Sequence, residues 1–210
     1  MLLGHPVAHS LSPRMQNAAF AAAGLADWHY EAWDVLPEEL ETAVGRARFA
    51  NVTAPYKRDV ARLLGSDLDS VNTIADGRAF STDAAVLDQV TDCYKPAIVG
   101  DGGAAAAFVA ALPEARRFAR RGEWPPRVED ADLVIHATSV RDEVLFELHE
   151  GQTLIDLPYP RTATAEAAAE NGARVLDGLE VLVAQGAASF ELWTGVPAPV
   201  AAMRAALGLP

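Results

Sequence analysis

Short apolar runs alternate with helix-like segments along almost the whole chain of 210 residues, and no other sequence feature limits the possible folds as strongly. The clearest case is the apolar run Ala97-Ile98-Val99, which the glycine-rich turn Gly100–Gly103 joins to the helical segment Ala104–Leu112. Strands that alternate with helices in this way form largely parallel sheets with helices on their faces. The pattern therefore predicts an α/β protein.

The same patterning places the remaining elements. Alternation of apolar residues predicts strands at residues 2–3, 28–35, 50–53, 71–75, 78–81, 117–119, 133–136 and 153–156. Helical periodicity predicts helices at residues 13–24, from 37 onward, and at 55–64, 83–90, 163–171, 179–194 and 200–207. Ser12 is expected to be the N-cap of the first helix, and Asp76-Gly77 predicts a hairpin turn between two strands.

One connection between strands is unusually short. After the strand at 117–119 and the two arginines that follow it, only eleven residues, 122–132, remain before the next strand, and they include Pro125-Pro126. A parallel crossover normally needs a dozen or more residues, usually with a helix, and two successive prolines prevent a helix. We therefore expect the crossover helix at this position to be missing.

Charge and composition exclude several classes of protein. The net charge of −12 argues against binding to nucleic acid or to an anionic membrane surface. No apolar run approaches the roughly 20 residues of a membrane-spanning helix, and the first residues lack the pattern of a secretory leader. Cys93 is the single cysteine, so no internal disulfide can form, and a reducing cytoplasm is expected.

Lys57 ends the run Asn51–Lys57 (NVTAPYK), and it is one of only two lysines in a chain with fifteen arginines. An arginine does not release its proton in a protein, whereas a partly buried lysine can do so. A lysine retained just after a predicted strand is therefore a candidate for proton transfer. The alternative is a solvent-exposed lysine in the first turn of the helix that follows Pro55.

Five short motifs occur in order along the chain: Ser10–Pro13 (SLSP), Asn51–Lys57 (NVTAPYK), Val71–Thr73 (VNT), Ser81–Asp83 (STD) and Asp177–Gln185 (DGLEVLVAQ). Each motif alone is weak, but the ordered set is specific. Together with the glycine-rich turn, these motifs resemble the shikimate dehydrogenase family. The resemblance implies an N-terminal α/β substrate domain over residues 1–92, completed by C-terminal helices at about 179–210. It also implies a Rossmann-like NADP-binding domain over residues 93–178, which is shortened here.

The resemblance further implies a site for a small polyhydroxylated cyclohexene carboxylate. Ser10, Ser12 and Thr53 match residues that contact the carboxylate, and hydroxyl donors near a helix N-terminus suit an anion. Asn72 matches a residue that holds a ring hydroxyl, and Gln185 matches a further hydroxyl or carboxylate contact. An amide, which both donates and accepts, is well suited to bind neighbouring hydroxyl groups.

Lys57 and Asp83 match the catalytic pair of the family, and Asp83 also matches a residue that holds a ring hydroxyl. Oxidation of a secondary alcohol removes a hydride from carbon and a proton from oxygen. A lysine can relay that proton while a nearby carboxylate orients the lysine. Tyr159 matches a tyrosine that faces the substrate, with a half-buried structural aromatic as the alternative. His5 and His9 lack a metal-ligand cluster, so no metal is expected.

The expected cofactor residues are those that match the NADP site of the family: Gly100, Gly102, Gly103, Ala104, Arg120, Arg121, Thr138 and Gly178. The glycine-rich turn follows a strand and opens a helix, which is the setting in which backbone N–H groups bind a pyrophosphate. Arg120 and Arg121 follow the next strand, where a guanidinium group suits the 2′-phosphate of NADP. The alternative for these two residues is a pair of solvated arginines.

Several residues depart from the pattern of the family. Asp101 replaces an alanine and places a carboxylate beside the expected pyrophosphate, which it would repel unless it points away. His136 replaces the asparagine of an N-A-T-S motif, and Val181 replaces a methionine that lies beside the nicotinamide. These departures indicate that the substrate half is better preserved than the cofactor half.

The resemblance implies an NADPH-dependent oxidoreductase that reversibly reduces 3-dehydroshikimate to shikimate, in the biosynthesis of aromatic amino acids by way of chorismate. Two alternatives stay open. One is a paralogue that acts on quinate or another hydroxy acid, and the other is a shikimate-binding protein with weak or lost cofactor binding. We expect a cytoplasmic monomer or homodimer whose ligands are small molecules.

Overall fold

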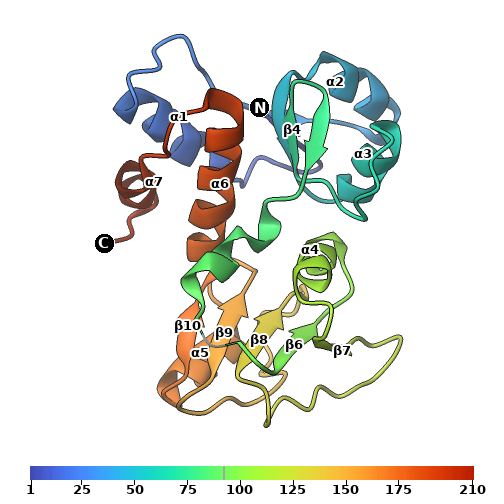
Figure 1. Cartoon of the computed structure of the whole chain (residues 1–210), viewed down its shortest axis with the longest axis vertical. Helices are drawn as coiled ribbons and strands as arrows, with labels where there is room; N and C mark the ends of the chain where they lie inside the picture. Colours follow the sequence, from blue (N-terminus) through green and yellow to red (C-terminus); the bar gives the residue numbers. More distant parts are fainter. Residues whose placement is uncertain (92) are drawn as a thin grey trace. The chain divides into compact units, whose positions relative to one another are not determined.

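The computed structural model describes residues 1–91 and 93–210. The chain divides into two compact units, of which the first contains Met1–Thr82 with Leu182–Pro210 and the second contains Asp83–Val181. Each unit is built on a five-stranded sheet of its own (Figure 1). No helix in the described part of the chain is long and apolar enough to cross a membrane.

The sheet of the first unit combines three parallel strands with a hairpin. Its strands are, in spatial order, β2 (Ala32–Asp34), β1 (Leu2–Gly4), β3 (Phe49–Val52), β4 (Thr73–Ala75) and β5 (Arg78–Phe80). β1 pairs in parallel with β2 and β3, whereas β4 is antiparallel to β3 and β5. The predicted turn joins β4 to β5, and the φ angles of Asp76 (48°) and Gly77 (74°) are both positive, as a type I′ turn requires.

The strand predicted at residues 28–35 contains only the three residues of β2. Tyr30, inside the predicted range, bonds to a side chain in place of a neighbouring strand. Its backbone N–H donates to Oδ1 of Asn17 at 2.9 Å, and its carbonyl oxygen accepts from Nδ2 of Asn17 at 2.8 Å. The Asn17 amide therefore satisfies the polar groups that a strand partner would have satisfied.

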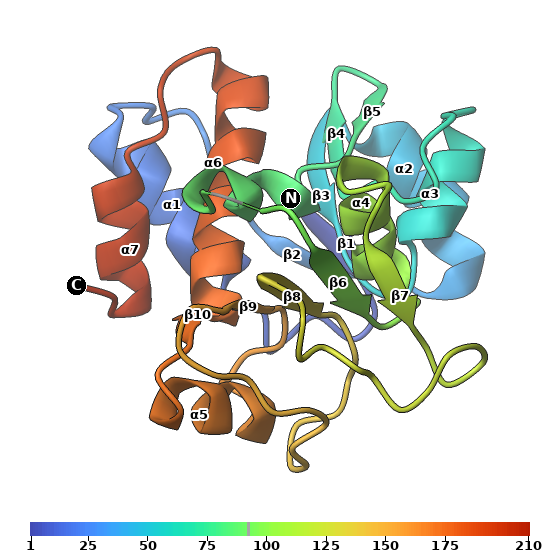
Figure 2. The ribbon, with the colours of Figure 1, turned by 60° about the horizontal axis from the view of Figure 1, so that its bottom comes forward.

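Helices cover both faces of this sheet. They are α1 (Ser12–Ala22), the 3₁₀ helix η1 (Pro37–Glu39), α2 (Leu40–Arg46), α3 (Lys57–Leu63), the part of α6 (Gly178–Thr194) from residue 182 onward, and α7 (Val200–Leu207). α2 and α3 pack on one face through Val44 and Val60, which share a core cluster with Leu3. α1 and α6 meet through the stacked rings of Phe20 and Phe190, with 5.4 Å between the ring centres. α7 lies beside α1 (Figures 1 and 2).

The N-terminus of α1 corrects one prediction. Ser12 is the first residue of the helix and not its N-cap. The hydroxyl oxygen of Ser10 accepts the backbone N–H of Ser12 at 3.2 Å. Because Pro13 is compatible with the first turn of a helix, the helix begins one residue earlier than the sequence pattern predicts. The two serines therefore lie together at the start of α1.

The sheet of the second unit is parallel throughout. Its strands are, in spatial order, β10 (Arg174–Leu176), β9 (Thr153–Asp156), β8 (Leu133–His136), β6 (Pro96–Val99) and β7 (Arg116–Phe118). The helices of this unit are the 3₁₀ helix η2 (Asp83–Gln89), α4 (Gly103–Ala111) and α5 (Ala163–Glu170), to which the first turn of α6 is added. Figure 2 shows α4 and α5 on opposite faces of the sheet. β10 is not among the predicted strands, but the α/β class is confirmed.

Two connections of this sheet contain no helix among the described residues. The connection from β7 to β8 has the predicted form, whereas the loss of a helix between β8 and β9 was not predicted. The first connection packs Val128 and Ala131 against the core, and the second packs Phe146 and Leu148. The Gln152 amide holds the first connection, because its Nε2 donates to the carbonyl oxygens of Val128 at 2.9 Å and Ala131 at 2.6 Å. Loops thus cover a sheet face that helices usually cover.

Candidate functional site

Polar residues of the first unit gather where its parallel strands end. Thr53 follows β3 directly, and its backbone N–H donates to the carbonyl oxygen of Leu3 at 2.9 Å. Because β4 runs antiparallel to β3, the residues that precede β4 lie at the same edge of the sheet. The Asn72 carbonyl oxygen accordingly accepts the backbone N–H of Val52 at 2.8 Å. Thr53 and Asn72 are therefore near neighbours at one edge.

Gly4 allows the loop that carries the two serines to approach this edge. A Cβ atom on Gly4 would lie 2.4 Å from Cγ2 of Thr53 and 2.7 Å from Cγ1 of Val7, so a larger residue does not fit. Val7 in turn accepts the backbone N–H of Ser10 at 3.0 Å. Ser10 is half-buried and Ser12 is buried. The structure thus brings the predicted carboxylate-binding residues to the strand ends of the first unit.

Asn72 and Gln185 are joined directly, although they are far apart in the sequence. Nδ2 of Asn72 donates to Oε1 of Gln185 at 3.3 Å and to the hydroxyl of Thr82 at 3.0 Å. Oδ1 of Asn72 accepts the backbone N–H of Thr82 at 2.7 Å. These bonds fix the orientation of the buried Asn72 side chain. Two of the predicted substrate residues therefore share one location.

Next to this pair lies a buried set of polar groups that motif matching did not single out. Nδ2 of Asn51 donates to the hydroxyls of Ser189 at 2.9 Å and Thr73 at 3.1 Å. The Tyr30 phenol donates to Oδ1 of Asn51 at 2.8 Å, and complete burial raises the pKa of this phenol well above its usual value. Ser189 follows Gln185 by one helical turn on α6, a spacing that places both on one face of the helix. That spacing is the signal that could have identified Ser189.

Lys57 and Asp83 belong to different units. Lys57 is the first residue of α3 and is partly exposed, and its carbonyl oxygen accepts the backbone N–H of Val71 at 3.1 Å. Lys57 therefore lies beside the segment that carries Asn72. Asp83 opens η2, is only 9% exposed, and follows Thr82 directly in the chain. The pairing of the Lys57 and Asp83 side chains stays a prediction.

In the second unit the strand order reverses between β6 and β8. From β6 the chain passes through α4 to β7 on one side, and it then crosses to β8 on the other side. In sheets of this type, ligands bind at such a switch point, outside the carboxyl ends of the strands. Gly100 (φ 129°) follows β6, and a Cβ atom there would lie 2.5 Å from the carbonyl oxygen of Ala137, which follows β8. The two loops at the switch point are therefore in direct contact.

The start of α4 has the features of a phosphate-binding site. Gly102 precedes the helix in an extended conformation, and Gly103 is the first helical residue. A Cβ atom built on Gly102 would have no non-adjacent atom of the described residues within 4 Å, so the space in front of this backbone is open. The N–H groups of the first helical turn, that of Ala104 among them, have no partner within the helix and suit a pyrophosphate. Asp101 is exposed in the same turn.

Arg120 and Arg121 follow β7, which neighbours β6 in the sheet. Both arginines are exposed. The guanidinium group of Arg120 lies 5.7 Å from the centre of a Trp124 ring. Gly122 closes a turn here by donating its N–H to the carbonyl oxygen of Ala119 at 2.8 Å. The two positive charges therefore stand at the carboxyl end of β7, beside the strand that carries the glycine-rich turn.

Gly178 begins α6 at a point of close backbone contact. A Cβ atom on Gly178 would lie 2.3 Å from the carbonyl oxygen of Pro158. Oδ1 of Asp177 accepts the backbone N–H of Leu179 at 3.1 Å and so caps the helix. Tyr159 follows Pro158 and is half-buried. Tyr159 thus belongs to the second unit, as Asp83 does, whereas Ser10, Ser12, Thr53, Asn72 and Gln185 belong to the first.

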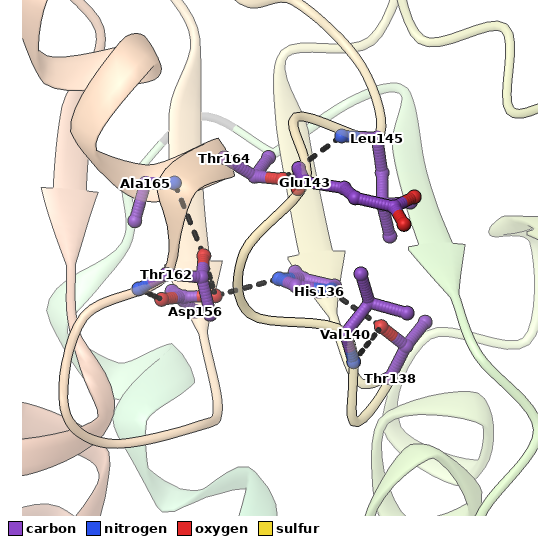
Figure 3. Close-up of polar contacts among 9 residues, drawn as sticks. All are labelled: His136, Thr138, Val140, Glu143, Leu145, Asp156, Thr162, Thr164 and Ala165. Atoms are coloured by element: carbon purple, nitrogen blue, oxygen red, sulfur yellow. Dashed lines mark hydrogen bonds and ion pairs between the residues drawn. The ribbon is translucent and has the colours of Figure 1, made fainter.

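Thr138 belongs to a hydrogen-bonded cluster shown in Figure 3. His136 and Asp156 are paired in register on β8 and β9, both side chains are completely buried, and Nδ1 lies 2.7 Å from Oδ1. The other ring nitrogen, Nε2, lies 2.6 Å from the hydroxyl oxygen of Thr138. Asp156 also accepts the backbone N–H and the hydroxyl of Thr162, each at 3.1 Å. Motif matching identified His136 only as a departure from the family pattern.

An all-parallel sheet with a glycine-rich turn at its switch point, in one chain with a second α/β unit, defines a two-domain α/β protein with a Rossmann-like sheet. Residues 2–74 match the shikimate dehydrogenase substrate binding domain, and residues 178–207 match the shikimate 5'-dehydrogenase C-terminal domain. The chain belongs to the shikimate dehydrogenase family. The predicted family is therefore confirmed.

Relatives match over almost the whole chain. The shikimate dehydrogenase (NADP(+)) of Halobacterium salinarum strain R1 is 33% identical, with 98% of this chain and 97% of the relative covered. The enzyme of the same name from Methanopyrus kandleri is 36% identical, with 98% and 93% covered. Among solved structures, the shikimate 5-dehydrogenase of Thermus thermophilus in complex with NADP(H) and shikimate is 31% identical. Its TM-score is 0.84, with 98% and 96% of the two chains covered.

The chain is a shortened member of this family. Its alignment with the Halobacterium enzyme extends over 258 positions, against 210 residues in this chain. The difference means that at least 48 aligned positions hold no residue of this chain. The two helix-free connections of the second unit agree with a shortened Rossmann-like sheet.

Proposed function

We propose that the protein is an NADP-dependent shikimate dehydrogenase, which catalyses shikimate + NADP⁺ ⇌ 3-dehydroshikimate + NADPH + H⁺. The observation that carries the proposal is the match over 98% of the chain to the Thermus structure in complex with NADP(H) and shikimate. The names of the Halobacterium and Methanopyrus relatives support the same reaction. The reaction belongs to the biosynthesis of aromatic amino acids by way of chorismate.

The strand ends of the first unit supply the groups that the substrate requires. Ser10, Ser12 and Thr53 bind the carboxylate, because their hydroxyl groups can donate hydrogen bonds to its oxygens. Asn72 and Gln185 bind ring hydroxyls. Their mutual hydrogen bond is long, at 3.3 Å, so a ring hydroxyl can replace it by accepting from one amide and donating to the other.

Lys57 and Asp83 act together in the transfer of the proton of the reacting hydroxyl. NADP⁺, when bound, accepts the hydride. Lys57 takes the hydroxyl proton as the alcohol becomes a ketone, and it returns a proton in the reverse direction. In agreement with the pattern of the family, Asp83 orients the ammonium group and binds the neighbouring hydroxyl, and Tyr159 contacts the substrate.

The second unit holds the cofactor at its switch point. Gly100 allows a close approach of the backbone, and the N–H groups of Gly102–Ala104 bind the pyrophosphate. Arg120–Arg121 bind the 2′-phosphate, since a guanidinium fork matches phosphate oxygens. Thr138 and Gly178 contact the nicotinamide half. The order of these groups follows the strand order β7, β6, β8.

The protein works as a monomer or homodimer in the cytoplasm, where a free cysteine such as Cys93 stays reduced. Burial and the nearby carboxylates of Asp132 and Glu114 raise the pKa of this thiol, which keeps it in the unreactive protonated form. Size-exclusion chromatography at several protein concentrations decides between the two oligomeric states.

The central test measures reduced nicotinamide formed from shikimate and NADP⁺, with quinate and NAD⁺ as comparators. Shikimate and NADP⁺ are expected to give the highest kcat/KM. Faster turnover of quinate would identify the paralogue instead. A titration of NADPH fluorescence, with and without shikimate, completes the test, because shikimate binding without NADPH binding would identify a ligand-binding protein.

A further inference from the structure

Asp156 fixes the position of one proton on His136. Its carboxylate is surrounded by three donors, namely Nδ1 of His136 and the hydroxyl and backbone N–H of Thr162. Carboxylate oxygens only accept hydrogen bonds, so Nδ1 must carry a proton. In the neutral ring, Nε2 is then an acceptor. Because both side chains are completely buried, water cannot replace either partner.

This tautomer sets the direction of the Thr138 hydroxyl. Nε2 of His136 lies 2.6 Å from Oγ1, so the hydroxyl proton of Thr138 points toward the ring. The backbone N–H of Val140 donates to the same oxygen at 3.2 Å. A hydroxyl oxygen has two lone pairs, so one lone pair remains. Since Thr138 is partly exposed, its remaining capacity is that of a hydrogen-bond acceptor.

The place of Thr138 in the sheet indicates which part of a dinucleotide it meets. In the strand order β7, β6, β8, the exposed arginines follow β7, the glycine-rich turn follows β6, and Thr138 follows β8. A dinucleotide with its 2′-phosphate at β7 and its pyrophosphate at β6 therefore has its nicotinamide half at β8. That half carries a carboxamide N–H₂ group and ribose hydroxyls, which are donors.

We propose that His136, anchored by Asp156, is a positioning residue that makes the Thr138 hydroxyl a hydrogen-bond acceptor for the nicotinamide half of NADP(H). The inference rests on the proposed cofactor role of the second unit. His136 acts only through Thr138 and does not touch the cofactor. The alternative is a purely structural role, in which the buried pair only ties β8 and β9 to the start of α5. In that case the effect of His136 does not depend on the Thr138 hydroxyl.

A double-mutant cycle separates the two roles. Thr138→Val removes the hydroxyl with little change of shape, and His136→Asn keeps an amide N–H for Asp156 but does not reach Thr138. Each single variant should weaken NADPH binding by about three- to tenfold, the effect of one lost hydrogen bond. In the Thr138→Val background, His136→Asn should cause no further loss, because His136 acts through the removed hydroxyl. Fluorescence titration gives the affinities, and circular dichroism verifies that each variant is folded.

Two controls sharpen the cycle. His136→Gln extends an amide to the place of Nε2, where its oxygen can accept the Thr138 proton, so this variant should recover most of the affinity that His136→Asn loses. Adenosine 2′,5′-bisphosphate lacks the nicotinamide half, so its binding should be the same in all variants. If His136→Asn does not fold, Asp156→Asn takes its place in the cycle, because the new amide N–H₂ group can donate to Nδ1 and so move the ring proton to Nε2.

The inference is overturned if His136→Asn lowers the NADPH affinity equally in the wild-type and Thr138→Val backgrounds. It is also overturned if the single variant His136→Asn keeps the full NADPH affinity of the wild type. Either result leaves the proposed function intact, since the wild-type protein then still binds NADPH. A wild-type protein that binds neither NADPH nor adenosine 2′,5′-bisphosphate overturns the cofactor role and the inference together. The two failures are thus distinguishable.

Discussion

Both sheets of this protein have polar groups at the ends of their strands, but the kinds of polar group differ between the two sheets. In the first unit, neutral groups such as Asn72, Gln185 and Ser189 belong to one connected set of amides and hydroxyls. In the second unit, the strand ends carry a glycine-rich turn, exposed arginines and the buried pair of His136 and Asp156. Neutral groups match ring hydroxyls, whereas backbone N–H groups and arginines match phosphates. The kind of polarity at a strand end therefore indicates which ligand it takes.

The largest effect is expected in the first unit. Lys57→Ala should lower kcat by about 10²- to 10⁴-fold, the usual range for a lost acid–base group, with shikimate affinity nearly unchanged. The matched control is Lys95→Ala, because Lys95 is the other lysine and is exposed in the second unit. Steady-state kinetics check both variants. Near-normal turnover of the Lys57 variant would remove Lys57 from the mechanism.

The second effect should appear in the cofactor preference and not in turnover. Arg121→Ala should reduce the preference for NADPH over NADH by about ten- to a hundredfold, which corresponds to one charge-assisted contact with the 2′-phosphate. Arg127→Ala is the control, since Arg127 is also an exposed arginine, further along the same connection. Calorimetry of both nucleotides gives the ratio. Tight NADH binding by the wild-type protein would contradict the assignment of Arg121.

The third effect contrasts two glycines on α6. Gly178→Ala should destabilise the protein by about 1–3 kcal/mol, because the new Cβ would meet the rigid backbone of Pro158 at 2.3 Å. Gly186→Ala meets only side-chain atoms, the flexible end of Met15 at 2.2 Å and Nε2 of Gln16 at 3.3 Å, and gains up to about 1 kcal/mol of helix propensity. The net change that Gly186→Ala causes in the free energy of unfolding should be close to zero. Thermal unfolding measures both variants, and equal losses would show that the backbone contact at Gly178 does not matter.

The smallest effect concerns the charge beside the glycine-rich turn. Asp101→Ala should tighten NADPH binding by about two- to fivefold at low salt, because an exposed charge contributes little and is screened by ions. Glu114→Ala is the control, since Glu114 is exposed beyond the opposite end of α4. A titration at two salt concentrations should show the gain at low salt only. Unchanged affinity at low salt would mean that Asp101 points away from the pyrophosphate.

Local sequence patterns predicted the elements that are long or that are bounded by distinctive turn residues such as glycine. The run from β6 through Gly100–Gly103 into α4 is an example, because each residue there favours the same local structure. β10 was missed because three residues contain too little periodicity. The end of the strand predicted near Tyr30 was also missed, because the Asn17 side chain replaces a strand partner through bonds that no local pattern reveals.

The two regions of the site also differed in how far the sequence could identify them. Motif matching selected Asn72 and Gln185, and their contact agrees with a shared substrate site. The pairing of His136 with Asp156 depends on the register between β8 and β9, across a sequence separation of 20 residues. A sequence does not state strand register, so the most unusual group of the second unit was visible only as a substitution.

The connection from β7 to β8 in the shortened unit depends on the single side chain of Gln152, and a helical connection would not depend on one side chain. A helical crossover would hold itself through its own repeated backbone bonds, whereas the segment from β7 to β8 is fastened at Val128 and Ala131 by one side chain. Local opening of such a segment requires few bonds to break, so it should occur far more often than global unfolding. Trypsin should accordingly cut first inside this segment, at the exposed Arg120, Arg121 or Arg127. The helix-free connection that shortens the chain should therefore also make the folded protein more susceptible to proteolysis.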